Sequence, residues 1–286
     1  HHAKGNMRKK EYYMLKSLDI NKKVYGENHR YIATDYANLG ALYLEKSLFR
    51  QALDTMAKAL DIYTFNKEYG THYTDLLHNI GNTYVNLGEY EKANIFINRG
   101  LCKNKGIYGE DHIDHLPFYI DLAESMYHIG FIDSSRYYYN KALELDAVEK
   151  INPKDRNKLI RSFAFFQAKQ GNVSESIRYI RSELTKAYQI SDRNNFINFL
   201  TYDLGRLYMQ SKDFANAKVY LEKAATLYEN ADYLEKNALM KSYLLLAQIA
   251  QQEGRFQNAI ALIDKSLNFT RYKKNDPYID LNDSQY

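Results

Sequence analysis

Small and apolar residues recur at helical spacing over residues 36–59, and a polar break at residues 45–47 divides them into two groups. The first group is Leu39, Gly40 and Tyr43, and the second is Ala52, Met56 and Ala59. Small residues in both groups allow two backbones to approach each other closely. The stretch therefore predicts two short amphipathic helices folded back on each other.

The same pattern returns along the chain with a period of 41 or 42 residues. The first small residue of each pair is Gly40, Gly81, Ala123, Ala164, Gly205 or Ala247. A second small residue follows twelve positions later, at Ala52, Ala93, Ser135, Ser176, Ala217 and Ala259. Six matches at each position predict six helix pairs. We expect their first helices over residues 31–46, 73–88, 115–130, 156–170, 194–211 and 233–253.

One more fragment precedes the first pair. Met14, Ser17 and Leu18 lie 42 residues before Met56, Ala59 and Leu60. This register predicts a leading helix from about Lys9 to Tyr25, the second helix of a repeat whose first helix is missing. Residues 1–6 read as the remnant of a tag, so we expect the native N-terminus to be missing.

One helix of the pair carries a large residue, then Leu-Gly and then Tyr, and the next helix carries Ala, an apolar residue and Ala. This pattern resembles the tetratricopeptide repeat (TPR). The long period and the loops at Tyr25–His29, Tyr69–His72 and Tyr108–His112 resemble the kinesin light chain type, with its bacterial relatives. This resemblance implies an all-α, right-handed superhelix of six helix pairs plus the leading helix. A His in each loop, or its neighbour, is expected to cap the following helix.

The repeats are expected to form a single solenoid domain over residues 7–272. Their predicted bounds are 31–70, 72–112, 114–153, 155–192, 194–231 and 233–272. Residues 273–286 are polar, include a Pro at position 277, and read as a tail or linker.

Composition narrows the range of partners. The 39 basic and 35 acidic side chains give a net charge of +4, without a basic block, so neither nucleic acid nor a membrane surface is expected as a partner. No apolar run approaches the roughly 20 residues that span a bilayer. The single cysteine excludes an internal disulfide and a thiolate metal site. We expect a cytoplasmic protein without a cofactor.

The resemblance implies that a peptide or protein segment binds along the concave face, which the first helices supply. Asn38, Asn79 and Asn82 form an amide ladder suited to a peptide backbone. The cations Lys158, Arg161, Lys169 and Arg206 lie with Phe165, Phe199 and Tyr202, which suits an acidic segment with apolar anchors. His78 and Tyr127 complete the predicted site. The alternative is that the amides bond within the array and the cations form a solvated helix face.

The chemistry-bearing motifs of enzymes are missing from the sequence. It contains no phosphate-binding glycine loop, serine elbow or paired-carboxylate motif. Residues 111–115 combine Asp and His, but they lie in an inter-repeat loop, where capping is the expected role. We therefore predict a non-enzymatic interaction scaffold. The alternative is the sensory or regulatory arm of a larger bacterial protein, fused to a protease, kinase or DNA-binding effector.

Overall fold

A computed structural model of the chain describes residues 2–148, 152–189, 196–229 and 236–274. Within these ranges the chain forms thirteen α-helices, one short 3-10 helix and no strand. The elements are α1 (His2–Tyr25), α2 (Arg30–Glu45), α3 (Phe49–Phe65), α4 (Thr71–Asn86), α5 (Tyr90–Tyr108), η1 (Ile113–His115), α6 (Leu116–His128), α7 (Ile132–Val148), α8 (Pro153–Lys169), α9 (Val173–Gln189), α10 (Phe196–Gln210), α11 (Phe214–Glu229), α12 (Lys236–Gln252) and α13 (Phe256–Lys274).

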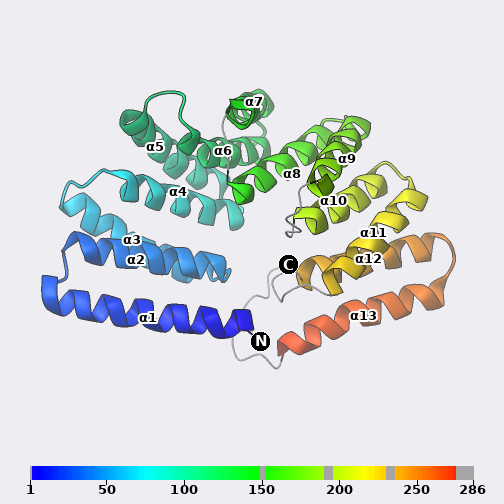
Figure 1. The fold of residues 1–286 in the computed structure, drawn as a ribbon, viewed down its shortest axis with the longest axis horizontal. Helices are drawn as coiled ribbons and strands as arrows, with labels where there is room; N and C mark the ends of the chain where they lie inside the picture. Colours follow the sequence, from blue (N-terminus) through cyan, green and yellow to red (C-terminus); the bar gives the residue numbers. More distant parts are fainter. Residues whose placement is uncertain (1, 149–151, 190–195, 230–235, 275–286) are drawn as a thin grey trace. The chain divides into compact units, whose positions relative to one another are not determined.

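The helices group into two compact units, His1–Ser162 and Phe163–Tyr286, and the division falls inside α8. In the first unit α2 packs on α3, α4 on α5 and α6 on α7, and in the second α10 packs on α11 and α12 on α13 (Figure 1). The described first helices begin and end within three residues of their predicted bounds. The predicted all-α fold of helix-pair repeats is confirmed.

The leading helix is longer than predicted. It was expected from about Lys9, but α1 begins at His2 and includes most of the residues that resemble a tag. None of residues 2–8 is a proline, and a single glycine, Gly5, costs a helix only about 1 kcal/mol, so nothing in the sequence stops the helix there. At the other end, the predicted tail lies outside the described residues from position 275 onward.

The paired helices approach each other most closely at the small residues. Ala52, Ala93 and Ala217 are all 0 % exposed. A Cβ placed on Gly205 would lie 2.6 Å from Cγ of Leu221 on the partner helix. These positions hold small side chains because nothing larger fits between the two backbones.

Tight turns join the two helices of each pair. Gly88, Gly130, Gly171 and Gly254 adopt left-handed conformations, with φ between 72° and 92°. Repeats one and five lack the glycine, and there Ser47 and Lys212 take up the same conformation, with φ of 59° and 61°. The turn geometry is therefore kept in all six repeats, although a side chain makes it less favourable in two of them.

Capping by the loop histidines holds for two of three loops. Nδ1 of His29 accepts a hydrogen bond from the backbone N–H of Tyr31, and Nδ1 of His112 accepts one from Asp114, both at 3.3 Å. His72 lies inside α4, whose cap residue is Gly70, and makes no such bond. At η1, Nε2 of the buried His115 is 2.7 Å from the carbonyl oxygen of Gly109. These histidines thus organise the loops between repeats.

Candidate functional site

The first helices of repeats one and two line a pocket of about 280 Å³ between α2 and α4. Its walls are mostly polar, and the lining residues are Thr34, Ala37, Asn38, Ala41, Tyr63, His72, Asp75, Leu76, His78 and Asn79. Three of the predicted binding residues, Asn38, His78 and Asn79, are therefore brought together. The carboxamides of Asn38 and Asn79 can both donate and accept hydrogen bonds, as a peptide backbone requires.

Asp75 is the carboxylate in the wall of this pocket. The residue is exposed, but partial desolvation of its carboxylate raises its pKa, while the nearby His78 and His72 oppose the rise. No described residue forms a hydrogen bond or an ion pair with the carboxylate of Asp75. A basic group that entered the pocket would meet a carboxylate without a partner.

A second carboxylate, Asp121 of α6, has the opposite surroundings. It is 0 % exposed, and Nε2 of His78 lies 2.9 Å from its Oδ2 atom. Nδ2 of Asn82 donates a hydrogen bond to the same oxygen at 2.8 Å. The ammonium group of Lys158, from α8, forms an ion pair with Oδ1. Asp121 thus joins side chains of α4, in the preceding helix pair, and of α8, in the following pair.

The charges of this network stabilise each other. Burial alone would raise the pKa of Asp121, but the Lys158 ammonium and the contact with His78 outweigh burial and hold the pKa well below its usual range. Burial likewise lowers the pKa of Lys158, but attraction to Asp121 and Glu124 is stronger and raises it. Both groups are therefore charged at neutral pH.

Asn82 and Lys158 were predicted to bind a partner, but their polar groups are already engaged within the chain. Besides its bond to Asp121, Asn82 accepts a hydrogen bond at its Oδ1 atom from Nδ2 of Asn86, at 2.9 Å. At Asn82 the structure has the internal bonding that the alternative interpretation expected of the amides. Lys158 instead has a buried ion-pair partner, whereas that interpretation expected a solvated helix face. Tyr127 and Arg161, on α6 and α8, are half-buried and do not line the α2–α4 pocket.

In the second unit the structure brings Phe165 and Arg206 together. The guanidinium carbon of Arg206, on α10, lies 4.1 Å from the ring centroid of Phe165, on α8. An Nη atom of Arg206 is also 3.5 Å from Oδ1 of the buried Asp203. The side chain is 42 % exposed, so the stacked guanidinium still presents N–H groups to solvent.

The other predicted residues of this unit differ in accessibility. Tyr202 is only 6 % exposed, and its ring packs edge-on against Tyr228 with centroids 6.5 Å apart. Phe199 is half-buried, and its ring centroid is 6.3 Å from that of Tyr228. Lys169, at the end of α8, is exposed. Tyr202 and Phe199 therefore contribute to the packing of the repeat.

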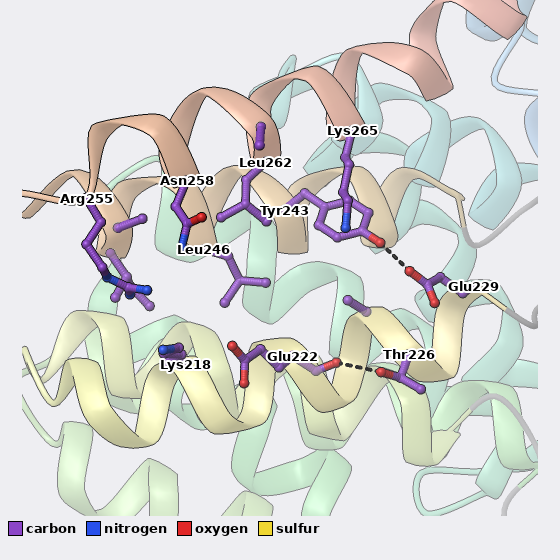
Figure 2. Close-up of a pocket in the computed structure, with 14 residues that line it drawn as sticks. Lys218, Glu222, Thr226, Glu229, Tyr243, Leu246, Arg255, Asn258, Leu262 and Lys265 are labelled. Atoms are coloured by element: carbon purple, nitrogen blue, oxygen red, sulfur yellow. Dashed lines mark hydrogen bonds between the residues drawn. The ribbon is translucent and has the colours of Figure 1, made fainter. Parts of the chain in front are cut away.

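A further pocket of about 360 Å³ lies between α11 and α13, the second helices of repeats five and six, with α12 beneath them. Leu246 and Leu262 point into it, and Lys218, Glu222, Arg255 and Lys265 surround it (Figure 2). On one side the hydroxyl of Tyr243 donates a hydrogen bond to Glu229. The sequence pattern directs attention to the first helices alone and does not predict this pocket.

The structural role of Asp121 was not predicted either. A signal was present, because Asp121 stands two residues before Ala123, as Asn38 and Asn79 stand before Gly40 and Gly81. Within the described part of the chain, no group of three or more His, Cys, Asp or Glu residues is arranged to hold a metal ion. None of the described helices is both long and apolar enough to cross a bilayer.

The fold defines a class of protein, an α-helical repeat solenoid built from helix pairs. Sequence models described as tetratricopeptide repeat match residues 1–64, 74–114, 202–230 and 241–271. These matches cover more than half of the chain. The chain belongs to the tetratricopeptide repeat family. Proteins of this kind are generally non-catalytic scaffolds for protein interactions.

Solved structures share this fold at low sequence identity. A tetratricopeptide repeat protein from Parabacteroides merdae has a TM-score of 0.65 at 18 % identity, over 96 % of this chain and 96 % of that chain. The kinesin light chain TPR-like repeats from Podosopora anserina have a TM-score of 0.55 at 13 % identity, over 68 % and 94 %. NprR, a quorum sensor from B. thuringiensis, in complex with its cognate peptide NprX, has a TM-score of 0.63 at 15 % identity, over 95 % and 80 %. No curated protein matches the chain in sequence.

Proposed function

We propose that the chain binds an extended peptide segment of a partner protein on the first-helix face of its first unit. The observation that carries this proposal is the pocket between α2 and α4, where Asn38 and Asn79 line one space. Two carboxamides from successive repeats can bond to a peptide backbone while a side chain enters the pocket. NprR, which has the same fold, was solved with its peptide NprX, and this supports the proposal by analogy alone.

The charges of the two units suit different parts of a partner. In the first unit the unpartnered Asp75 favours a basic or amine-bearing residue in the pocket. In the second unit the stacked Arg206 and the exposed Lys169 favour an acidic residue, with the Phe165 ring as an apolar contact. The acidic partner with apolar anchors expected from the sequence is therefore proposed for the second unit.

The test uses an immobilised peptide library of random sequence. Asn38→Ala combined with Asn79→Ala is expected to lose the peptides that the wild type retains, because the backbone bonds are removed. The matched control is Asn98→Ala on the second helix α5, whose amide bonds to the Asn94 carbonyl oxygen away from the pocket. If the double variant folds and retains the same peptides as the wild type, the α2–α4 pocket is not the binding site.

The charge assignment has its own test. Arg206→Gln is expected to remove acidic peptides from the retained set and to reduce the dependence of their binding on salt. Arg178→Gln, on the second helix α9, changes a side chain that is 77 % exposed and is the control for net charge. Equal retention of acidic peptides by both variants would exclude Arg206 from the site.

A second candidate function is that of a regulatory arm of a larger protein, and the likeness to the quorum sensor NprR favours it. In this case the peptide is a signal and the same pocket is its receptor. Size of the ligand separates the two functions. A regulatory arm should bind short free peptides as tightly as the same segment within a protein, and a scaffold should not.

A further inference from the structure

The pocket between α11 and α13 lies in the sixth repeat, which carries no aromatic ring at two positions where each other repeat carries at least one. One ring position lies three residues after the first small residue of a pair, and the other lies three residues after the second. In repeats one to five at least one of the two positions is aromatic: Tyr43, Tyr84 with Phe96, Tyr138, Tyr179, and Tyr208 with Tyr220. In repeat six the two positions are Ala250 and Leu262.

In repeats two and five, which carry both rings, the two rings stack on each other. Tyr84 stacks on Phe96 with centroids 5.6 Å apart and an interplanar angle of 22°. Tyr208 stacks on Tyr220 at 5.4 Å and 17°. Both Ala250 and Leu262 line the α11–α13 pocket. The two positions that carry stacked rings in repeats two and five therefore line an open pocket in repeat six.

The floor of this pocket is apolar and its rim is charged. Leu246 is 6 % exposed and Ala250 is 2 % exposed, so both are set below the surface between the two second helices. Lys218, Arg255 and Lys265 stand at the rim against two acidic residues, Glu222 and Glu229 (Figure 2).

These charges are not equally available. The carboxylate of Glu229 accepts the hydroxyl of Tyr243, and Arg255 pairs with Glu253. The ammonium group of Lys265 lies 5.6 Å from the ring centroid of Tyr243. Lys218 forms no hydrogen bond or ion pair with any described residue. A negatively charged group beside the ring site would therefore find a cation without a partner.

We propose that this pocket binds an aromatic side chain of a partner segment, with a carboxylate beside the ring. The ring takes the place that the chain's own stacked rings occupy in repeats two and five, over Leu246, Ala250 and Leu262. The carboxylate meets Lys218. A pocket of about 360 Å³ is at the small end of the range for ligand sites and accommodates one such side chain. This site is independent of the peptide pocket in the first unit.

The test follows the methyl signals of Leu246 and Leu262 by NMR while N-acetyl-tyrosine is added to the full chain. Saturable shifts of both residues are expected. N-acetyl-tyrosine amide, which lacks the carboxylate, should bind several-fold more weakly, and N-acetyl-leucine, which lacks the ring, should give no saturable shift. An absence of shifts with N-acetyl-tyrosine, or an equal response to N-acetyl-leucine, overturns the proposal.

Two variants locate the site. Ala250→Tyr restores the residue type of repeats two and five, and it should abolish binding while raising the melting temperature, because the chain then fills its own pocket. Leu262→Phe is the second filling variant, used if Ala250→Tyr does not fold, and should act in the same direction. Binding that persists in a folded filling variant contradicts the assignment.

A further experiment moves the proposed site from repeat six to repeat five. Tyr208→Ala with Tyr220→Leu copies the residues of repeat six into repeat five. Combined with Ala250→Tyr, it should move the binding of N-acetyl-tyrosine to the fifth repeat, as shifts of Leu204 instead of Leu246, and the binding should be weaker because Ile177 stands there in the place of Lys218. If this triple variant folds and binds nothing there, the missing rings do not make the site.

Discussion

One position in the repeat has opposite surroundings in neighbouring parts of the first unit. Two residues before the first small residue of the pair, repeats one and two carry Asn38 and Asn79, which line the open pocket between α2 and α4. Repeat three carries Asp121, which is 0 % exposed and is held by side chains from α4 and α8. The helical period assigns all three residues to the same face. The adjacent helices determine whether that face is open to a partner or filled.

Charge explains why the aspartate cannot have the surroundings of the asparagines. The free-energy cost is small for an amide that faces water in a pocket, whereas a carboxylate that is fully buried requires a cation and hydrogen-bond donors. Lys158 and Asn82 meet this requirement. At this position the third repeat therefore uses its polar side chain for packing between repeats, whereas Asn38 and Asn79 of the first two repeats line an open pocket.

The largest effect is expected from removing the buried charge. Asp121→Asn should lower the free energy of unfolding by about 3 kcal/mol, the lower end of the range for breaking a buried pair. The lower end applies because the side chain of Lys158 is 36 % exposed and keeps contact with water. Urea denaturation measures the change. Lys169→Gln, an exposed cation on the same helix as Lys158, is the control and should change stability by no more than about 0.5 kcal/mol.

The same substitution predicts a pH dependence. The pKa of Asp121 is lowered in the folded protein, whereas the unfolded chain has the ordinary value of about 3.9. The stabilisation is therefore complete above that value and is lost as the pH falls below it. The difference in unfolding free energy between wild type and Asp121→Asn should be constant from about pH 7 to about pH 5 and should shrink below about pH 4. A difference that stays constant down to about pH 3 would show that Asp121 is not stabilised as a carboxylate.

The fold could be predicted from sequence because each repeat supports it independently. Small residues such as Ala93 and Ala217 mark the closest approach of paired helices, and their 0 % exposure confirms this. Helix ends agree well with the prediction where a glycine or its substitute forms the turn. The predicted start of α1 is wrong because a tag-like composition does not end a helix when it contains no helix-breaking proline.

The candidate site could be predicted only in part. Helical spacing indicated that Asn38, His78 and Asn79 share a face, and they line one pocket. The pattern within one repeat could not show that Lys158 pairs with Asp121, since the two residues are 37 positions apart and in different repeats. The α11–α13 pocket is lined by the two positions that carry no ring in repeat six. One missing ring does not single out this repeat, because repeats one, three and four each lack one of the two rings.

Glycines also differ in whether their surroundings are open or filled, and their substitution by alanine should change the free energy of unfolding by an intermediate amount. A Cβ on Gly205 would lie 2.6 Å from Cγ of Leu221, whereas a Cβ on Gly106 would have nothing within 4 Å. Gly205→Ala should therefore cost about 1–3 kcal/mol through overpacking. Gly106→Ala, in the helix α5, should stabilise by about 0.5–1 kcal/mol because alanine loses less conformational entropy. Thermal unfolding of both variants tests the opposite signs, and a stabilising Gly205→Ala would refute the close approach of α10 and α11.

The smallest effects separate the two asparagines of α4, which the sequence pattern treats alike. Asn82→Ala removes a hydrogen bond to the buried carboxylate and should cost about 1–2 kcal/mol, since His78 and Lys158 remain beside Asp121. Asn79→Ala removes an amide from the pocket wall and should change the free energy of unfolding by no more than about 0.5 kcal/mol. Peptide binding should show the reverse order, with Asn79→Ala losing more affinity than Asn82→Ala. Parallel urea denaturation and binding measurements decide the comparison, because a residue that packs and a residue that binds shift different readouts. Equal losses of stability in the two variants would mean that the bond between Asn82 and Asp121 contributes nothing and that both amides face solvent alike.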